Sequence, residues 1–104
     1  MLDYIKSAAE VQAEAADAHK RHVTRAIDAH VEAQAHALQY NGAAHLASYV
    51  ASGVAEWAAE AQAFVAWRDA CWIAALDMLA DAESSGEVPS AEDVTAALPK
   101  WSDA

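Results

Sequence analysis

Apolar and small residues in the first forty positions recur alternately three and four residues apart. This seven-residue period is typical of a helix that packs against another helix in a coiled coil. It predicts one long helix from about Asp3 to about Tyr40, roughly 55 Å in length at the usual rise per residue. The heptad positions are Leu2, Ile5, Ala9, Gln12, Ala16, His19, Val23, Ala26, His30, Ala33, Ala37 and Tyr40.

Alanine occupies most of these heptad positions, and Gln12, His19 and His30 are polar exceptions. Alanine lets helices approach closely but buries little apolar surface. Polar residues in a heptad usually set register or oligomeric state at a cost in stability. We therefore expect this helix to bind another copy of itself or a partner.

Two other interpretations of the first helix remain open. An alanine-rich helix can match a heptad by chance. A competing apolar stripe would instead pack on the second half of the same chain. That stripe consists of Val23, Ile27, Val31 and Leu38.

Glycine and proline divide the rest of the chain into further helices, and no segment alternates with the period of two that a strand requires. Gly42 is placed to take the left-handed conformation that ends a helix. Ser90 can cap a last helix, with Asp93 three residues on, and Pro99 ends it. The predicted helices run over Ala44–Ala51, Val54 to about Glu83, and Ala91–Leu98. The predicted fold class is all-α.

The third predicted helix is apolar around much of its circumference and must be covered on several sides. Its large side chains are Trp57, Phe64, Trp67, Cys71, Trp72, Leu76 and Leu79. Trp67 and Trp72 fall on different faces, and Arg68, four residues before Trp72, can stack on its indole. We expect Trp67, Arg68 and Trp72 to contact a partner, the alternative being that the aromatic residues form the core.

The chain divides at the first glycine into a long helix over 1–41 and a helical head over 42–104. Hydrophobic residues make up 56% of the sequence, but many of them are alanine. The larger side chains cluster between Val54 and Leu79. A short chain with so few large apolar residues in its first half is expected to need another chain for stability.

The formal net charge of −10 argues against nucleic acid as a partner, because phosphate binding needs clustered cations. The same charge argues against binding to an anionic membrane surface. Lys20, Arg21 and Arg25 form one basic cluster, with Asp17 four residues before Arg21. This pattern is typical of a solvated helix face with ion pairs.

Residues that carry out chemistry are few. His19 and His22 have no third ligand at helical spacing, so a metal site would require several copies of the chain to gather His19 or His30 on an axis. The single Cys71 has no disulfide partner and is expected to be a buried thiol. No nucleophile, phosphate-binding or dinucleotide-binding motif is present, so we expect neither an enzyme nor a cofactor.

Two segments bear on targeting. The N-terminus lacks the charged and apolar regions of a secretory signal. The stretch from Ala61 to Ala80 is long enough to span a membrane but carries Arg68, Asp69 and Asp77. Charges at bilayer depth are costly, so we expect a buried helix instead.

The second half of the chain resembles small accessory proteins of tailed bacteriophages, especially the C-terminal helical part of tail-fibre assembly proteins. The resemblance covers roughly residues 22 to 101. It is carried by the run from Ala59 to Trp72, which includes Trp67-Arg68, and by the ending Leu98-Pro99-Lys100-Trp101. It adds Trp101 to the expected partner contacts.

The resemblance implies a non-enzymatic tail protein, bound to fibre or baseplate proteins as a chaperone or as a retained part of the virion. It also implies a location in the virion tail, and in the host cytoplasm during assembly. A homo-oligomer is expected, and a trimer is favoured because tail fibres are commonly trimeric. The alternative is a cytosolic acidic adaptor, or an antitoxin-like inhibitor of a basic partner.

Overall fold

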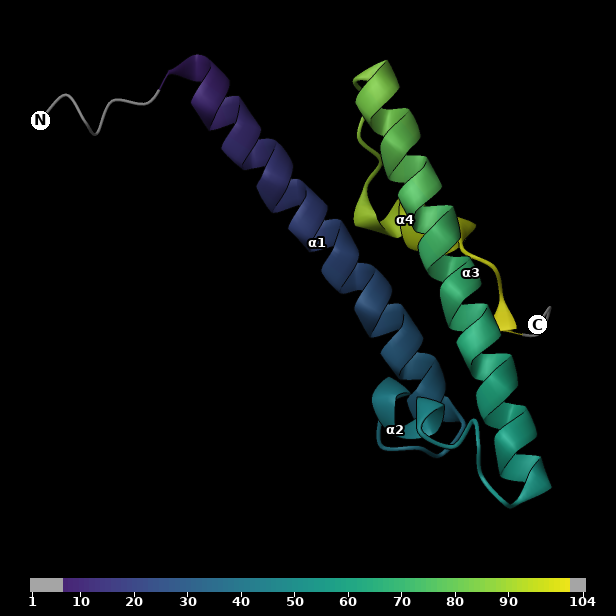
Figure 1. The fold of residues 1–104 in the computed structure, drawn as a ribbon. Helices are drawn as coiled ribbons and strands as arrows, with labels where there is room; N and C mark the ends of the chain where they lie inside the picture. The colour runs from purple at the N-terminus through teal and green to yellow at the C-terminus, as the bar shows by residue number, and fades with distance from the viewer. Residues whose placement is uncertain (1–6, 102–104) are drawn as a thin grey trace, which may run out of the picture.

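The chain folds into four helices, as the computed structural model, which describes residues 7–101, shows (Figure 1). No strand occurs in this part of the chain, so the predicted all-α class is confirmed. The helices are α1 (Ala8–Ala37), α2 (Ala43–Ala47), α3 (Ala55–Ser85) and α4 (Ala91–Ala97).

Two long antiparallel helices set the shape of the molecule. α1 and α3 diverge toward the N-terminal end of α1, with α2 near the C-terminal end of α1 and α4 between the long helices at mid-height (Figure 1). The molecule measures 62 × 31 × 19 Å, and its radius of gyration is 17.8 Å. A compact domain of this length has a radius of gyration of about 13 Å, so the fold is elongated.

The first long helix begins later than expected within the described residues. Ser7 is its N-cap, and the Ser7 side chain accepts a hydrogen bond from the Glu10 N–H at 3.1 Å. The predicted part of the helix before Ser7 lies outside the described residues. α1 ends at Ala37, three residues before the expected end.

The end of α1 corrects the prediction for Gly42. Gln39, with φ 76°, takes the left-handed conformation instead. The Tyr40 N–H donates to the Ala35 carbonyl at 3.1 Å, and the Gln39 N–H donates to the His36 carbonyl at 2.9 Å. These two bonds form a Schellman motif, which satisfies carbonyls that the helix end leaves free.

Gly42 serves the start of α2, and its backbone is extended, with φ 165°. A Cβ atom at this position would collide with the Glu32 carboxylate. Glu32 Oε1 accepts a hydrogen bond from the Ala43 N–H at 2.8 Å. Glycine therefore allows a side chain of α1 to approach and cap α2.

The remaining helices lie close to their predicted ranges. α2 is shorter than the predicted Ala44–Ala51, because the chain continues as turns from residue 48. α3 begins and ends within two residues of expectation and terminates at Gly86, whose φ is 81°. The predicted cap of α4 is confirmed: the Ser90 hydroxyl accepts from the Asp93 N–H at 3.1 Å.

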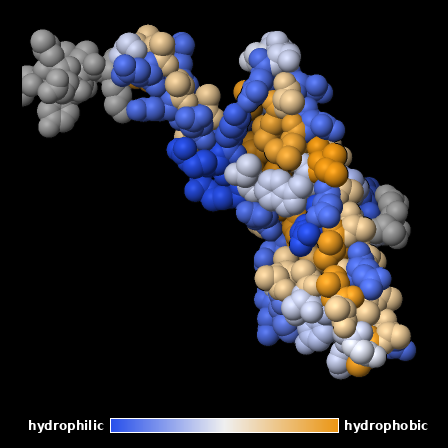
Figure 2. Space-filling model, in the orientation of Figure 1, coloured by the Kyte–Doolittle hydropathy of each residue, from blue (hydrophilic) through white to orange (hydrophobic). Residues whose placement is uncertain are grey.

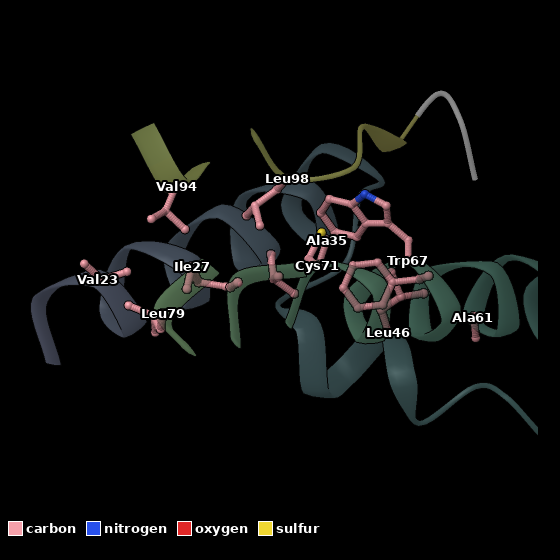
Figure 3. Close-up of a cluster of buried hydrophobic side chains, with 13 residues drawn as sticks. Val23, Ile27, Ala35, Leu46, Ala61, Trp67, Cys71, Leu79, Val94 and Leu98 are labelled. Atoms are coloured by element: carbon pink, nitrogen blue, oxygen red, sulfur yellow. The ribbon is translucent and has the colours of Figure 1, made fainter. Parts of the chain in front are cut away.

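One hydrophobic core joins the predicted long helix to the predicted head (Figure 3). α1 contributes Val23, Ile27, Val31 and Ala35, each at most 3% exposed. α3 contributes the larger share, and α2 and α4 each add one buried helical residue, Leu46 and Val94. The second half of α1 thus packs on its own chain, as the competing stripe predicted.

The C-terminal segment closes over α3. The Trp67 indole N–H donates to the Pro99 carbonyl at 2.8 Å. Trp101 meets Trp67 edge-on, with ring centroids 5.7 Å apart and an interplanar angle of 87°. Figure 3 shows the Trp67 indole beside this segment, next to Cys71 and Leu98.

Candidate helix-docking surfaces

The front half of α1, from Ala8 to Ala18, projects beyond the core. Every residue from 7 to 18 is exposed. The predicted contacts Ala9, Gln12 and Ala16 are among them, and Val11 is 51% exposed. Isolated helices of this length are marginal in water, so this segment gains little stability from its own chain.

Several of the later heptad residues contact other parts of the same chain, whereas Ala33 and Ala37 are exposed. Val23 is completely buried, which removes it from the surface offered to a partner. His19 Nε2 lies 2.9 Å from the Pro89 carbonyl oxygen. The His30 ring lies 5.7 Å from the Trp67 ring. Leu2 and Ile5 lie outside the described residues.

The expected aromatic contacts face mainly inward. Trp67 is 3% exposed and belongs to the core, so it offers almost no surface. Trp72 and Trp101 are partly buried and pack against the same core. The Arg68 guanidinium group donates to Asp69 Oδ1 at 2.9 Å. These residues therefore fit the alternative in which the aromatic side chains form the core.

Sequence reasoning missed an exposed face on α3. The sequence predicts that Leu76 and Trp57 are covered, but they are 56% and 49% exposed, and Ile73 is 61% exposed. Ile73 lies opposite the buried face, and Leu76 lies at its edge, beside Leu79; both belong to a seven-residue pattern in which every member is exposed. We call this the outer face of α3: Ala55, Ala59, Gln62, Ala66, Asp69, Ile73, Leu76 and Ala80.

The outer face of α3 combines apolar and acidic side chains. Figure 2 shows hydrophobic atoms gathered along the course of α3. Asp69 lies within the face, and Asp77 and Asp81 are exposed beside it. The signal for this face was present in the sequence as a second three-four spacing, but the buried aromatic residues on the same helix obscured it.

A groove separates the diverging parts of α1 and α3. A cavity of about 400 Å³ there is lined by residues of both helices, including Thr24, Leu76 and Leu79. Lys20 and Glu83 bridge it, with Nζ and Oε1 2.6 Å apart. Their hydrogen bond raises the pKa of Lys20 and lowers the pKa of Glu83.

Two observations on the described part of the chain concern metal ligands and the thiol. No three His, Cys, Asp or Glu side chains gather there in a group that could hold a metal ion. Burial raises the pKa of the Cys71 thiol, which disfavours the reactive thiolate. None of the described helices is long and apolar enough to cross a membrane.

Comparison of the chain with known protein families, curated proteins and solved structures found no match.

Proposed function

We propose that this protein is a non-enzymatic assembly subunit that binds other helices through the outer face of α3 and the front half of α1. The observation that carries this proposal is the exposure of Ile73 and Leu76, 61% and 56%, in a continuous seven-residue pattern. Two large aliphatic side chains one turn apart form a helix-sized contact that water solvates poorly. A second helix laid along α3 would bury both.

Charge favours the first helix of a second copy as the occupant. α3–α3 pairing would bring like charges together, because Asp69, Asp77 and Asp81 follow the outer face. α1 carries the exposed Arg21 and Arg25, four residues apart, which matches the spacing of Asp77 and Asp81. Opposite charges at this spacing fix register and orientation between helices.

Contact between α1 of one copy and α3 of the next joins two different surfaces. Repeated contacts of this kind close into a ring when the rotation permits. A ring of three copies is our favoured assembly, in keeping with the trimeric symmetry of tail fibres. It would also cover the front half of α1, which its own chain leaves exposed.

The proposed setting is the tail of a bacteriophage, with the subunit bound to fibre or baseplate proteins. This setting comes from the resemblance carried by Trp67-Arg68 and the ending Leu98-Pro99-Lys100-Trp101. The Trp67–Pro99 hydrogen bond and the Trp67–Trp101 contact link the two parts of that pattern. The subunit would fold in the host cytoplasm and join the virion tail.

An acidic adaptor of a basic partner is the second candidate. The acids beside the outer face of α3 favour it, because a foreign basic helix would complement them as well as α1 does. Under this alternative the free chain is monomeric, and high salt weakens the complex.

Exchange of the charges tests the proposal. Sedimentation equilibrium would compare the native chain with Arg21→Glu/Arg25→Glu, which we expect to dissociate the oligomer. Adding Asp77→Lys/Asp81→Lys to that variant should restore it, because the pairs are reversed. Failure of the second exchange to restore assembly would reject pairing of α1 with α3.

The matched control is Lys100→Glu, which reverses a charge at an exposed lysine after α4 that belongs to neither surface. It should leave the sedimenting mass unchanged. Mass spectrometry of purified phage particles separately tests the proposed setting, which requires this chain in the tail or on its assembly intermediates.

A further inference from the structure

A second cavity lies at the other end of the molecule, between the end of α1, the α2 region and the start of α3. Its volume is about 380 Å³, within the range of small-molecule sites. Figure 1 places α2 beside the C-terminal end of α1. The cavity is lined by Leu38, Gln39, Tyr40, His45, Tyr49, Trp57 and Glu60, and we call it the aromatic pocket.

Three large rings meet in the aromatic pocket at steep angles. The Tyr40 and Tyr49 ring centroids are 5.7 Å apart, with the rings inclined at 59°. Those of Tyr49 and Trp57 are 5.8 Å apart, at 82°. Trp57 is 49% exposed, so its indole is accessible to a ligand. The faces of such rings carry negative electrostatic potential and attract cations.

A carboxylate completes this arrangement. Glu60 Oε1 accepts a hydrogen bond from the Tyr40 hydroxyl at 2.8 Å, which positions the carboxylate in the pocket wall. This bond raises the pKa of Tyr40 and so keeps its hydroxyl protonated. His45 Nδ1 accepts a hydrogen bond from the Asn41 N–H at 3.1 Å, which holds the imidazole in the pocket wall.

No lysine or arginine lines the aromatic pocket. Arg25, the nearest lysine or arginine of α1 in sequence, precedes Leu38 by roughly 20 Å of helix. Arg68 on α3 is paired with Asp69. The pocket therefore combines ring faces and a carboxylate without a lysine or arginine in its lining.

We infer that the aromatic pocket binds an organic cation, either a quaternary ammonium group or a guanidinium group. Such ions are weakly hydrated compared with a primary ammonium, so ring faces can replace their water at low cost. Trp57 and Tyr49 would contact the cation face-on, and Glu60 would supply the opposite charge. The cation belongs either to a free small molecule or to a side chain of a partner protein.

Titration of the full chain with choline and with 3,3-dimethyl-1-butanol, its neutral carbon analogue, tests this inference. Two-dimensional NMR would follow the indole N–H signals. Choline should shift the Trp57 signal in a saturable manner and bind at least about tenfold more tightly than the analogue. Equal binding of the two probes, or no shift by choline up to about 50 mM, would overturn the inference.

Variants separate cation binding from general packing. Trp57→Ala removes an exposed ring and should weaken choline binding about tenfold. Glu60→Gln keeps an acceptor for Tyr40 but removes the charge, and should also weaken binding. Tyr49→Phe retains the ring face and should leave binding within about twofold. Unchanged affinity in both Trp57→Ala and Glu60→Gln would contradict the site, provided that circular dichroism shows them folded.

A third probe, N-acetyl-arginine amide, represents an arginine side chain of a partner protein. Comparing its affinity with that of choline identifies the source of the cation. Tighter binding than choline would assign the pocket to a protein partner. Tighter binding of choline would assign it to a free quaternary ammonium compound. Because none of the four exchanged residues, Arg21, Arg25, Asp77 and Asp81, lines the pocket, the charge-exchange variants should bind choline as the native chain does.

Discussion

The indole N–H of Trp67 donates a hydrogen bond to the carbonyl of Pro99, at 2.8 Å, across 32 residues of sequence. The bond fastens the segment after α4 to the middle of α3, where Trp101 packs edge-on against the same indole. A residue that the sequence marked as a partner contact thus holds the chain's own C-terminal segment in place.

Replacement of Trp67 by phenylalanine tests this role. Trp67→Phe keeps an aromatic ring in the core but leaves the Pro99 carbonyl with only the weak Cys71 thiol donor, so the free energy of unfolding should fall by about 1–2 kcal/mol. Urea denaturation monitored by circular dichroism measures the change. Trp57→Phe, at an exposed site, should stay within about 0.5 kcal/mol of the native chain. Equal effects of the two substitutions would contradict this assignment.

Gln39 offers a stabilising substitution. Its left-handed conformation, φ 76°, is costly for a residue with a Cβ atom and free of strain for glycine. Gln39→Gly should therefore raise the free energy of unfolding by about 0.5–1 kcal/mol. Gln34→Gly, inside α1, should lower it by a similar amount, about 0.5–1 kcal/mol. Destabilisation by both substitutions would argue against the Schellman motif.

The Lys20–Glu83 pair predicts a pH dependence. Because the pKa of Glu83 is lower in the folded protein, the ionised carboxylate stabilises the fold. This stabilisation is complete above the pKa of Glu in the unfolded chain, about 4.3, and is lost as the pH falls through the lower pKa of the folded protein. Because the pKa of Lys20 is higher in the folded protein, its ammonium group also stabilises the fold. This stabilisation is complete below the pKa of Lys in the unfolded chain, about 10.4, and is lost as the pH rises through the higher pKa of the folded protein.

Thermal melting of Glu83→Gln against the native chain measures that contribution. The difference in Tm between the two proteins should be largest between about pH 4.3 and about pH 10.4 and should vanish in acid. Glu87→Gln, four residues on and also exposed, is the control and should show no such profile. A Tm difference that persists unchanged in strong acid would rule out the ion pair as its cause.

The thiol of Cys71 should be unreactive in the folded protein. It is completely buried, and burial raises its pKa, so little thiolate forms at neutral pH. An aromatic disulfide reagent should react on the order of a hundredfold more slowly than with the denatured chain. Reaction at the denatured rate under native conditions would show that the core around Cys71 opens freely.

Helix positions could be predicted because capping and breaking residues act locally. Ser90 caps α4 as its spacing to Asp93 indicated, and Gly86 ends α3. The end of α1 could not be placed, because a glutamine holds the left-handed position and the nearby Gly42 has a different role. That role depends on Glu32, ten residues earlier, and such tertiary contacts leave no local signal.

The candidate surfaces were harder to predict than the helices. The heptad in α1 was visible, but sequence spacing could not tell which of its positions pack internally. Val23 lies in the core, whereas Ala9 and Ala16 are exposed. On α3, Ile73 and Leu76 could be assigned to the outer face only once α1, α2 and α4 were known to cover the opposite side.

The front half of α1 gives an independent check on assembly. Its amides should exchange with solvent quickly when the protein is dilute and dissociated, since residues 7–18 are all exposed. In the oligomer, partner contact should slow this exchange. Fast exchange at every protein concentration would show that the segment stays uncovered.

The mass of the protein in solution tests the central claim most directly. Multi-angle light scattering of the purified chain, beside Ile73→Glu/Leu76→Glu, should show an oligomer, favoured as a trimer, for the native chain. The variant should be monomeric with unchanged helicity, because both side chains lie outside the core. A native chain that stays monomeric and fully helical at high concentration, or a variant that assembles equally well, would contradict assembly through the outer face of α3.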